Sequence, residues 1–168
     1  MKETMGPYWH LHPLRVRYQE TDQMAVVFHA NYVVWFEIGR TELIRHAGFP
    51  YADTERSGLL LPVTELDCRF VQPARYDDRI VICTRIASYS AVRLSFESQI
   101  RKIKETDQPP VTVSVDGELP GELLVSGGTR HVWLGRDWRP ARLDKTAPEL
   151  FNTLCRVVKG NDEGGAKE

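Results

Sequence analysis

The sequence contains no long hydrophobic run. No apolar stretch approaches the roughly 20 residues that a helix needs to cross a bilayer, so a membrane-spanning protein is not expected. The segment from Met1 to His12 has one lysine and no apolar centre, so it does not resemble a signal peptide. The formal net charge is −1, which gives no electrostatic reason to expect nucleic acid or a membrane surface as a partner.

Cysteine is scarce. Cys68, Cys83 and Cys155 are scattered and odd in number, and no C-x-x-C spacing occurs. This pattern favours reduced, mostly buried thiols in a reducing compartment over a disulfide framework. We therefore expect a cytoplasmic protein, and a nucleophilic cysteine has no local support.

Several catalytic and cofactor motifs are also missing. Ser126-Gly127-Gly128 lacks a G-x-S-x-G frame, and the chain has neither a P-loop nor a G-x-G-x-x-G motif. His10-x-His12 has metal-like spacing, but it lies in a segment expected to be mobile and without further ligands. No metal and no cofactor are predicted.

A long helix is the clearest structural element. Asn31 is a suitable N-cap for a helix that ends near Ala47, with Gly48 as its stop signal. Apolar residues cover most of its first two turns, which indicates a buried helix. Gly39 in its middle costs about 1 kcal/mol relative to alanine, and close packing against a sheet would explain it.

Alternation with a period of two predicts strands around this helix. A short strand is expected at Arg15–Tyr18, before the helix, and an antiparallel meander after it. The meander comprises 64–70, 80–86, 92–101, 111–115 and 122–134, and Thr146 begins a final helix that ends near Val157. We predict an α+β fold with one domain over residues 1–159 and a disordered tail over 160–168. Free sheet edges favour a homodimer or homotetramer.

The segment from Tyr18 to Tyr32 carries the candidate chemistry. Asp22 precedes a loop that leads to the start of the helix, where unpaired N–H groups and the positive end of the helix dipole lie. These groups could stabilise a thioester oxyanion, and the carboxylate could attack the carbonyl or activate water. Spacing alone would equally fit a structural cap.

The motif T-D-x-x-x-V-V-x-H-x-N-Y, followed by F-E-I-G-R-T-E-L, closely resembles the 4-hydroxybenzoyl-CoA thioesterase/YbgC-like family of hotdog acyl-CoA thioesterases. P-A-R-Y-D-D and R-H-V-W-L extend the resemblance over roughly residues 14–157. It implies a hotdog fold, with a five- to six-stranded antiparallel sheet around the helix. It also implies hydrolysis of an acyl-CoA to a free acid and CoA.

The resemblance assigns roles to individual residues. Asp22 matches the catalytic aspartate, and the backbone N–H of His29 matches the group that polarises the thioester carbonyl. Asn31 and Tyr32 match the helix start, and Tyr18 matches an aromatic position beside the aspartate. Two departures are visible. Gln23-Met24-Ala25 replaces a glycine-containing run, and residues 104–121 form a longer stretch of unknown role.

Alternatives remain open at several positions. Glu37 is a second candidate acid, although pairing with Arg40 is the simpler interpretation. Tyr18, Phe28, Tyr32 and Trp35 could line an aromatic acyl pocket, or they could belong to the core. Late arginines such as Arg136 and Arg139 could bind the phosphates of CoA or simply face solvent. A non-catalytic acyl-CoA-binding module and a hotdog dehydratase are the competing functions.

Overall fold

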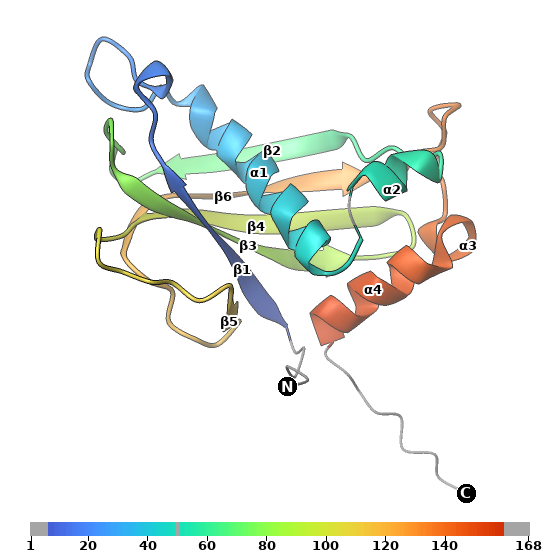
Figure 1. Cartoon of the computed structure of the whole chain (residues 1–168). Coiled ribbons are helices and arrows are strands. Elements are labelled where there is room, and N and C mark those ends of the chain that lie inside the picture. The colour runs from blue at the N-terminus through green and yellow to red at the C-terminus, as the bar shows by residue number, and fades with distance from the viewer. Residues whose placement is uncertain (1–6, 50, 160–168) are drawn as a thin grey trace, which may run out of the picture.

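The computed structural model describes residues 7–49 and 51–159. Within them, one antiparallel sheet of six strands has the spatial order β2-β6-β4-β3-β1-β5, and the long helix α1 lies across one of its faces (Figure 1). The strands are β1 (Tyr8–Arg15), β2 (Val63–Phe70), β3 (Arg79–Tyr89), β4 (Arg93–Lys102), β5 (Thr112–Ser114) and β6 (Glu122–Val132). The helices are the 3-10 turn η1 (Tyr18–Glu20), α1 (Ala30–His46), α2 (Tyr51–Arg56), α3 (Leu143–Thr146) and α4 (Pro148–Lys159). The predicted α+β architecture is confirmed.

The core lies between α1 and the sheet. Successive side chains of a strand point to opposite faces, so Leu94, Phe96 and Ile100 of β4 face α1 and are buried. Trp35 and Phe36 of α1 are fully buried in the same layer. Truncating either aromatic side chain to alanine would cost about 3–5 kcal/mol. Of the two interpretations left open for Trp35, pocket wall or core, the structure supports the core, because its ring is fully buried.

Gly39 marks the point where α1 comes closest to the sheet. A Cβ atom at this position would lie 2.2 Å from Thr84 Oγ1 and 2.7 Å from Ile82 Cγ2. Any side chain here would push the helix away from β3. The predicted close approach is confirmed, and it accounts for a glycine in mid-helix.

Residues 103–121 cover part of the opposite face of the sheet. Trp9, Leu11, Val81 and Cys83 point away from α1 and form a separate apolar cluster with Ile103, Val113 and Leu119. The strand β5 within this segment pairs with β1 at the edge of the sheet. The long stretch noted in the sequence thus closes a second, smaller core.

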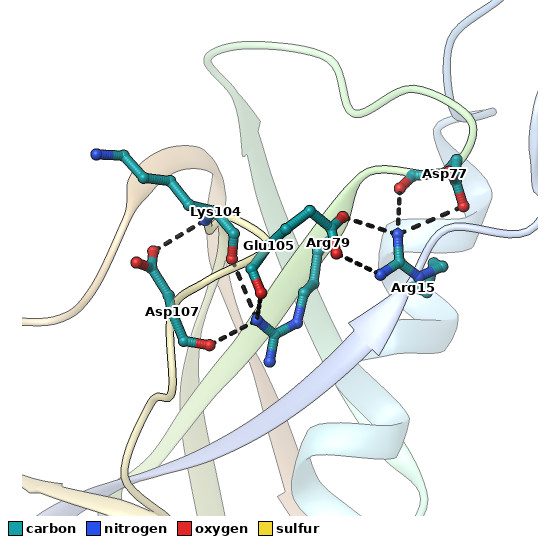
Figure 2. A network of polar contacts seen from close by, with 6 residues as sticks. All are labelled: Arg15, Asp77, Arg79, Lys104, Glu105 and Asp107. Atoms are coloured by element: carbon teal, nitrogen blue, oxygen red, sulfur yellow. Dashed lines mark hydrogen bonds and ion pairs between the residues drawn. The ribbon is translucent and has the colours of Figure 1, made fainter.

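Two arginines tie this segment to the strands (Figure 2). The guanidinium of Arg15 donates to both carboxylate oxygens of Glu105, at 2.9 and 2.7 Å. Arg79 Nη1 donates to the main-chain carbonyls of Lys104, Glu105 and Asp107. These contacts fix the start of the segment over β1 and β3.

The N-terminal part of the chain differs from the prediction. The strand predicted at Arg15–Tyr18 is wrong, because β1 ends at Arg15 and Tyr18 begins η1. The expected mobility of the His10-x-His12 segment is also wrong, because His10 pairs with Thr84 of β3 and is only 5% exposed. Burial, with the nearby His46 and His12, lowers the pKa of His10 to about 4. Long-range pairing with β3 decides this strand, and no local pattern reports such pairing.

The C-terminal part contains two helices where one was predicted. Thr146 ends α3, and Pro148 occupies the first position of α4, where its missing N–H costs nothing. The apolar face of α4 buries Leu150, Leu154 and Val157 in the core cluster that also contains Leu43 and Trp133. The predicted tail over 160–168 lies outside the described residues.

Candidate active site

Asp22 lies in a tight turn. Its main-chain N–H donates to the Val26 carbonyl at 2.9 Å, and its carbonyl accepts from Ala25 N–H at 3.0 Å. Its Oδ1 accepts from the Met24 N–H at 2.8 Å. Among the described residues, Oδ2 has no hydrogen-bond partner. The side chain is half-buried, and the loop orients one of its two carboxylate oxygens.

The turn has a backbone conformation that usually requires glycine, although it contains no glycine. Ala25 has φ +61°, in the left-handed region that glycine adopts at no steric cost. Ala25 occupies the position where the resemblance leads one to expect a glycine-containing run. The substitution has therefore not abolished the turn, although an L-residue there is strained.

The start of α1 provides hydrogen-bond donors next to this turn. His29 is the N-cap residue and makes no side-chain capping bond. Within residues 7–49 and 51–159, the main-chain N–H groups of His29 and Ala30 have no acceptor. They lie at the positive end of the helix dipole, where a developing oxyanion could be stabilised. Asn31, predicted as the N-cap, lies inside the first turn instead.

Asn31 joins the turn to the helix. Its Nδ2 donates to the Glu20 carbonyl at 2.9 Å, and the N–H of Phe28 donates to the same oxygen at 2.9 Å. An antiparallel bridge between Thr21 and Val27 closes the loop between them. The chain therefore returns on itself, and Asp22 is held beside the helix start. A substrate contact for Asn31 stays a prediction.

A cavity of about 290 Å³ opens at this end of α1. His29 and Tyr32 line it from the helix, Met24 from the loop, and Phe70 and Val71 from the end of β2. Most of these groups are apolar, which suits the carbon chain or ring of an acyl group. The first residue in the chain that lines this cavity is Met24, two residues after Asp22.

Tyr32 and Tyr18 occupy different environments. Tyr32 is buried, its hydroxyl accepts from Ala74 N–H at 2.9 Å, and burial raises its pKa. It therefore forms a fixed wall of the cavity and anchors the turn after β2. Tyr18 is 76% exposed and packs edge-on against Tyr76, with ring centroids 5.6 Å apart.

Glu37 lies further along α1, on the rim of a second cavity of about 300 Å³. Thr41 and Ile44 of the helix, and Leu61 and Val63 before and in β2, also line it. The structure thus separates Glu37 from the turn that holds Asp22, by two turns of helix.

His131, at the base of the second cavity, is a structural histidine. Burial, with Arg40 nearby, lowers its pKa to about 4, so the ring is neutral at pH 7. Its Nδ1 lies 3.3 Å from the Leu61 carbonyl, and its Nε2 lies 2.8 Å from Thr129 Oγ1. A carbonyl can only accept, so we assign the proton to Nδ1, and Nε2 accepts from Thr129. Both nitrogens are engaged, so the ring links β6 to the residues before β2.

Other reactive groups are poorly suited to nucleophilic attack. Burial raises the pKa of Cys83 to about 12, and it also raises the pKa of Cys68. Both remain thiols near neutral pH. The described residues contain no group of three or more His, Cys, Asp or Glu side chains that could hold a metal ion. Nor do they include a helix long and apolar enough to span a membrane.

Known proteins share this sequence and architecture. Residues 24–108 match the family model described as the thioesterase superfamily. YneP of Bacillus subtilis (strain 168) is 33% identical over 147 residues, which cover 87% of this chain and 95% of YneP. The acyl-CoA thioester hydrolase YbgC of Escherichia coli O157:H7 is 35% identical over 94 residues, or 56% of this chain and 70% of YbgC. The DHNA-CoA thioesterase of Staphylococcus aureus superposes with a TM-score of 0.76 at 30% identity, covering 89% of this chain and 90% of that one.

The six-stranded sheet around α1 and the similarity to known thioesterases define a thioester hydrolase of the hotdog fold. The chain belongs to the thioesterase superfamily. The predicted family and enzyme class are confirmed.

Proposed function

We propose that this enzyme hydrolyses an acyl-CoA to a free acid and CoA, with Asp22 as the group that drives the reaction. The observation that supports this most directly is the turn itself. It holds one oxygen of Asp22 through Met24 N–H and leaves the other without a partner among the described residues. The relative YbgC carries the name of an acyl-CoA thioester hydrolase, which supports the substrate class.

The thioester carbonyl would lie against the N–H groups of His29 and Ala30, which would hold the developing oxyanion. In one route, Asp22 attacks the carbonyl carbon, the C–S bond breaks, CoA leaves as the thiolate, and water then hydrolyses the mixed anhydride. In the other, Asp22 takes a proton from water as that water attacks. Both routes use the same geometry and consume one water molecule.

An exposed edge strand supports a homodimer. β2 lies at the edge of the sheet, and Val63, Leu66 and Phe70 along it are 47%, 41% and 54% exposed. Native proteins cover or pair such edges. In a two-fold dimer with β2 paired to its own copy, the Val63 end of one strand meets the Phe70 end of the other. The Glu37 cavity of one protomer would then adjoin the His29 cavity of the second copy and complete the acyl site.

Thiol release from short, long and aromatic acyl-CoAs, compared between the wild type and Asp22→Asn, tests the proposed reaction. The substitution keeps the shape of the side chain and removes its charge, so we expect kcat to fall by about 10²- to 10⁴-fold. Asp116→Asn, at an exposed loop residue, is the matched control and should retain full activity. A fully active Asp22→Asn variant would overturn the assignment. Binding of acyl-CoA without turnover by the wild type would favour the non-catalytic binding module.

Single-turnover hydrolysis in oxygen-18 water tests the anhydride route. Label recovered in the Asp22 carboxylate excludes direct attack alone, because it requires water to attack the Asp22 carbonyl carbon of the mixed anhydride. Label found only in the product acid fits direct attack by water and equally fits attack of water on the acyl carbon of the anhydride.

A further inference from the structure

Glu20 is a buried carboxylate two residues before Asp22. The residue is 4% exposed. Its Oε2 accepts from the main-chain N–H of Arg17 at 2.8 Å, and its Oε1 accepts from Trp35 Nε1 at 3.1 Å and from Arg17 Nη2 at 3.2 Å. Burying a carboxylate is unfavourable unless it is paired and hydrogen-bonded, and here both conditions are met.

The main chain of Glu20 is engaged as fully as its side chain. Its carbonyl accepts from Phe28 N–H and from Asn31 Nδ2, both at 2.9 Å. Together with the bond from the Trp35 indole, these contacts attach Glu20 to positions 28, 31 and 35, around the start of α1. Thr21, between Glu20 and Asp22, is held in turn by a 2.6 Å bond from its hydroxyl to the Tyr18 carbonyl.

We propose that Glu20 is a positioning residue: it sets the place of the Asp22 carboxylate relative to the N–H groups of His29 and Ala30. This inference rests on the proposed role of Asp22. Glu20 does not touch the reacting atoms; it clamps the segment that carries the acid onto the helix that carries the oxyanion donors. A misplacement of about 1 Å between reacting groups lowers the rate by about 10²-fold, so such a clamp governs kcat.

Glu20→Gln is the informative substitution. The amide keeps the size of the side chain and one acceptor oxygen, which can still serve Trp35, but its NH₂ group cannot accept from the Arg17 N–H. We expect kcat to fall by about 10- to 100-fold with KM changed less than about threefold, because the cavity walls are untouched. Glu118→Gln, at an exposed loop residue, is the matched control and should leave both constants unchanged.

A merely structural role is distinguished by combining variants. If Glu20 acts through Asp22, its substitution should change the residual rate of Asp22→Asn less than about twofold, since no carboxylate is left to position. The same fold loss in both backgrounds would show a general structural effect and overturn the proposal. An unchanged kcat for Glu20→Gln would overturn it as well.

Trp35→Phe provides a second route should Glu20→Gln not fold. It removes the indole donor that links the carboxylate to α1, and the same dependence on the Asp22 background is expected. Full activity of Asp22→Asn would instead reject the proposed function, so the two failures are separable. Each variant is assayed well below its own midpoint of thermal unfolding.

Discussion

The indole N–H of Trp35 donates to the carboxylate of Glu20 across 3.1 Å, and both groups are buried. This contact joins the middle of the second turn of α1 to the segment that leads into Asp22. The segment before the acid is therefore attached directly to the helix, while the Met24 N–H in the exposed loop orients the Asp22 carboxylate itself.

Charge on the exposed edge strand should break the proposed dimer. Leu66 lies midway along β2 and is 41% exposed, so Leu66→Lys would place a cation at the two-fold contact. We expect a monomer by analytical ultracentrifugation, with activity lost by at least about tenfold because the acyl site is incomplete. Val111→Lys, at a residue 56% exposed in the segment after β4, should leave assembly and activity intact. An active, monomeric Leu66→Lys would contradict the shared site.

Glycine at position 25 should stabilise the enzyme. The left-handed conformation of Ala25 costs about 1–2 kcal/mol, which glycine avoids, although its greater freedom in the unfolded chain returns part of this. We expect Ala25→Gly to raise the free energy of unfolding by about 0.5 kcal/mol in urea denaturation. Ala52→Gly, on an exposed face of α2, should lower it by about 1 kcal/mol. A loss of stability at both positions would show that the turn is not strained.

A methyl group at position 39 should destabilise the fold despite the higher helix propensity of alanine. Its Cβ would meet Thr84 Oγ1 at 2.2 Å, and overpacking of this kind costs about 1–3 kcal/mol. Thr84→Ala removes that oxygen, which has no hydrogen-bond partner among the described residues. The double variant should therefore recover part of the loss, as measured by thermal unfolding. Equal losses in the single and double variants would place the clash elsewhere, for example at Ile82.

Two buried histidines should make the fold sensitive to acid. Burial lowers the pKa of both His10 and His131 to about 4, below the value near 6.5 of an unfolded histidine. Between these values the unfolded chain binds more protons, so the stabilisation is complete above about pH 6.5 and is lost as the pH falls toward 4. His131→Gln should flatten the dependence of unfolding free energy on pH in this window. Val111→Gln, at an exposed residue that carries no proton-binding group, should leave the slope unchanged.

The sequence predicted the parts of the molecule whose signals are local. The long helix, the alternating strands and the acid before the helix start all follow from residues close together in the chain. Gly39 was explained in advance because its cost in a helix requires a compensating contact, which Thr84 and Ile82 supply. The roles suggested for Asn31 and Tyr32 were less complete, since both side chains also bind main-chain atoms of neighbouring loops.

Other features required tertiary contacts. β1 was missed because Trp9 and Leu11 become core only when residues 103–121 fold over them, far along the chain. No local pattern in the sequence indicated that the Glu20 carboxylate is buried. Its donor Trp35 lies 15 residues away in the chain, and only the fold brings the two side chains together.

The sequence by itself determined the family, the helix and the position of the acid, because these depend on short motifs and on hydrophobic periodicity. Only the tertiary structure decided which polar groups are left free for a substrate. Asp22 keeps one oxygen without a partner among the described residues, whereas Glu20, also acidic and two residues away, is fully bonded. The difference arises from burial and from Trp35, which lies 15 residues from Glu20 in the chain and donates to its carboxylate, whereas the donor to Asp22 is the nearby Met24 N–H.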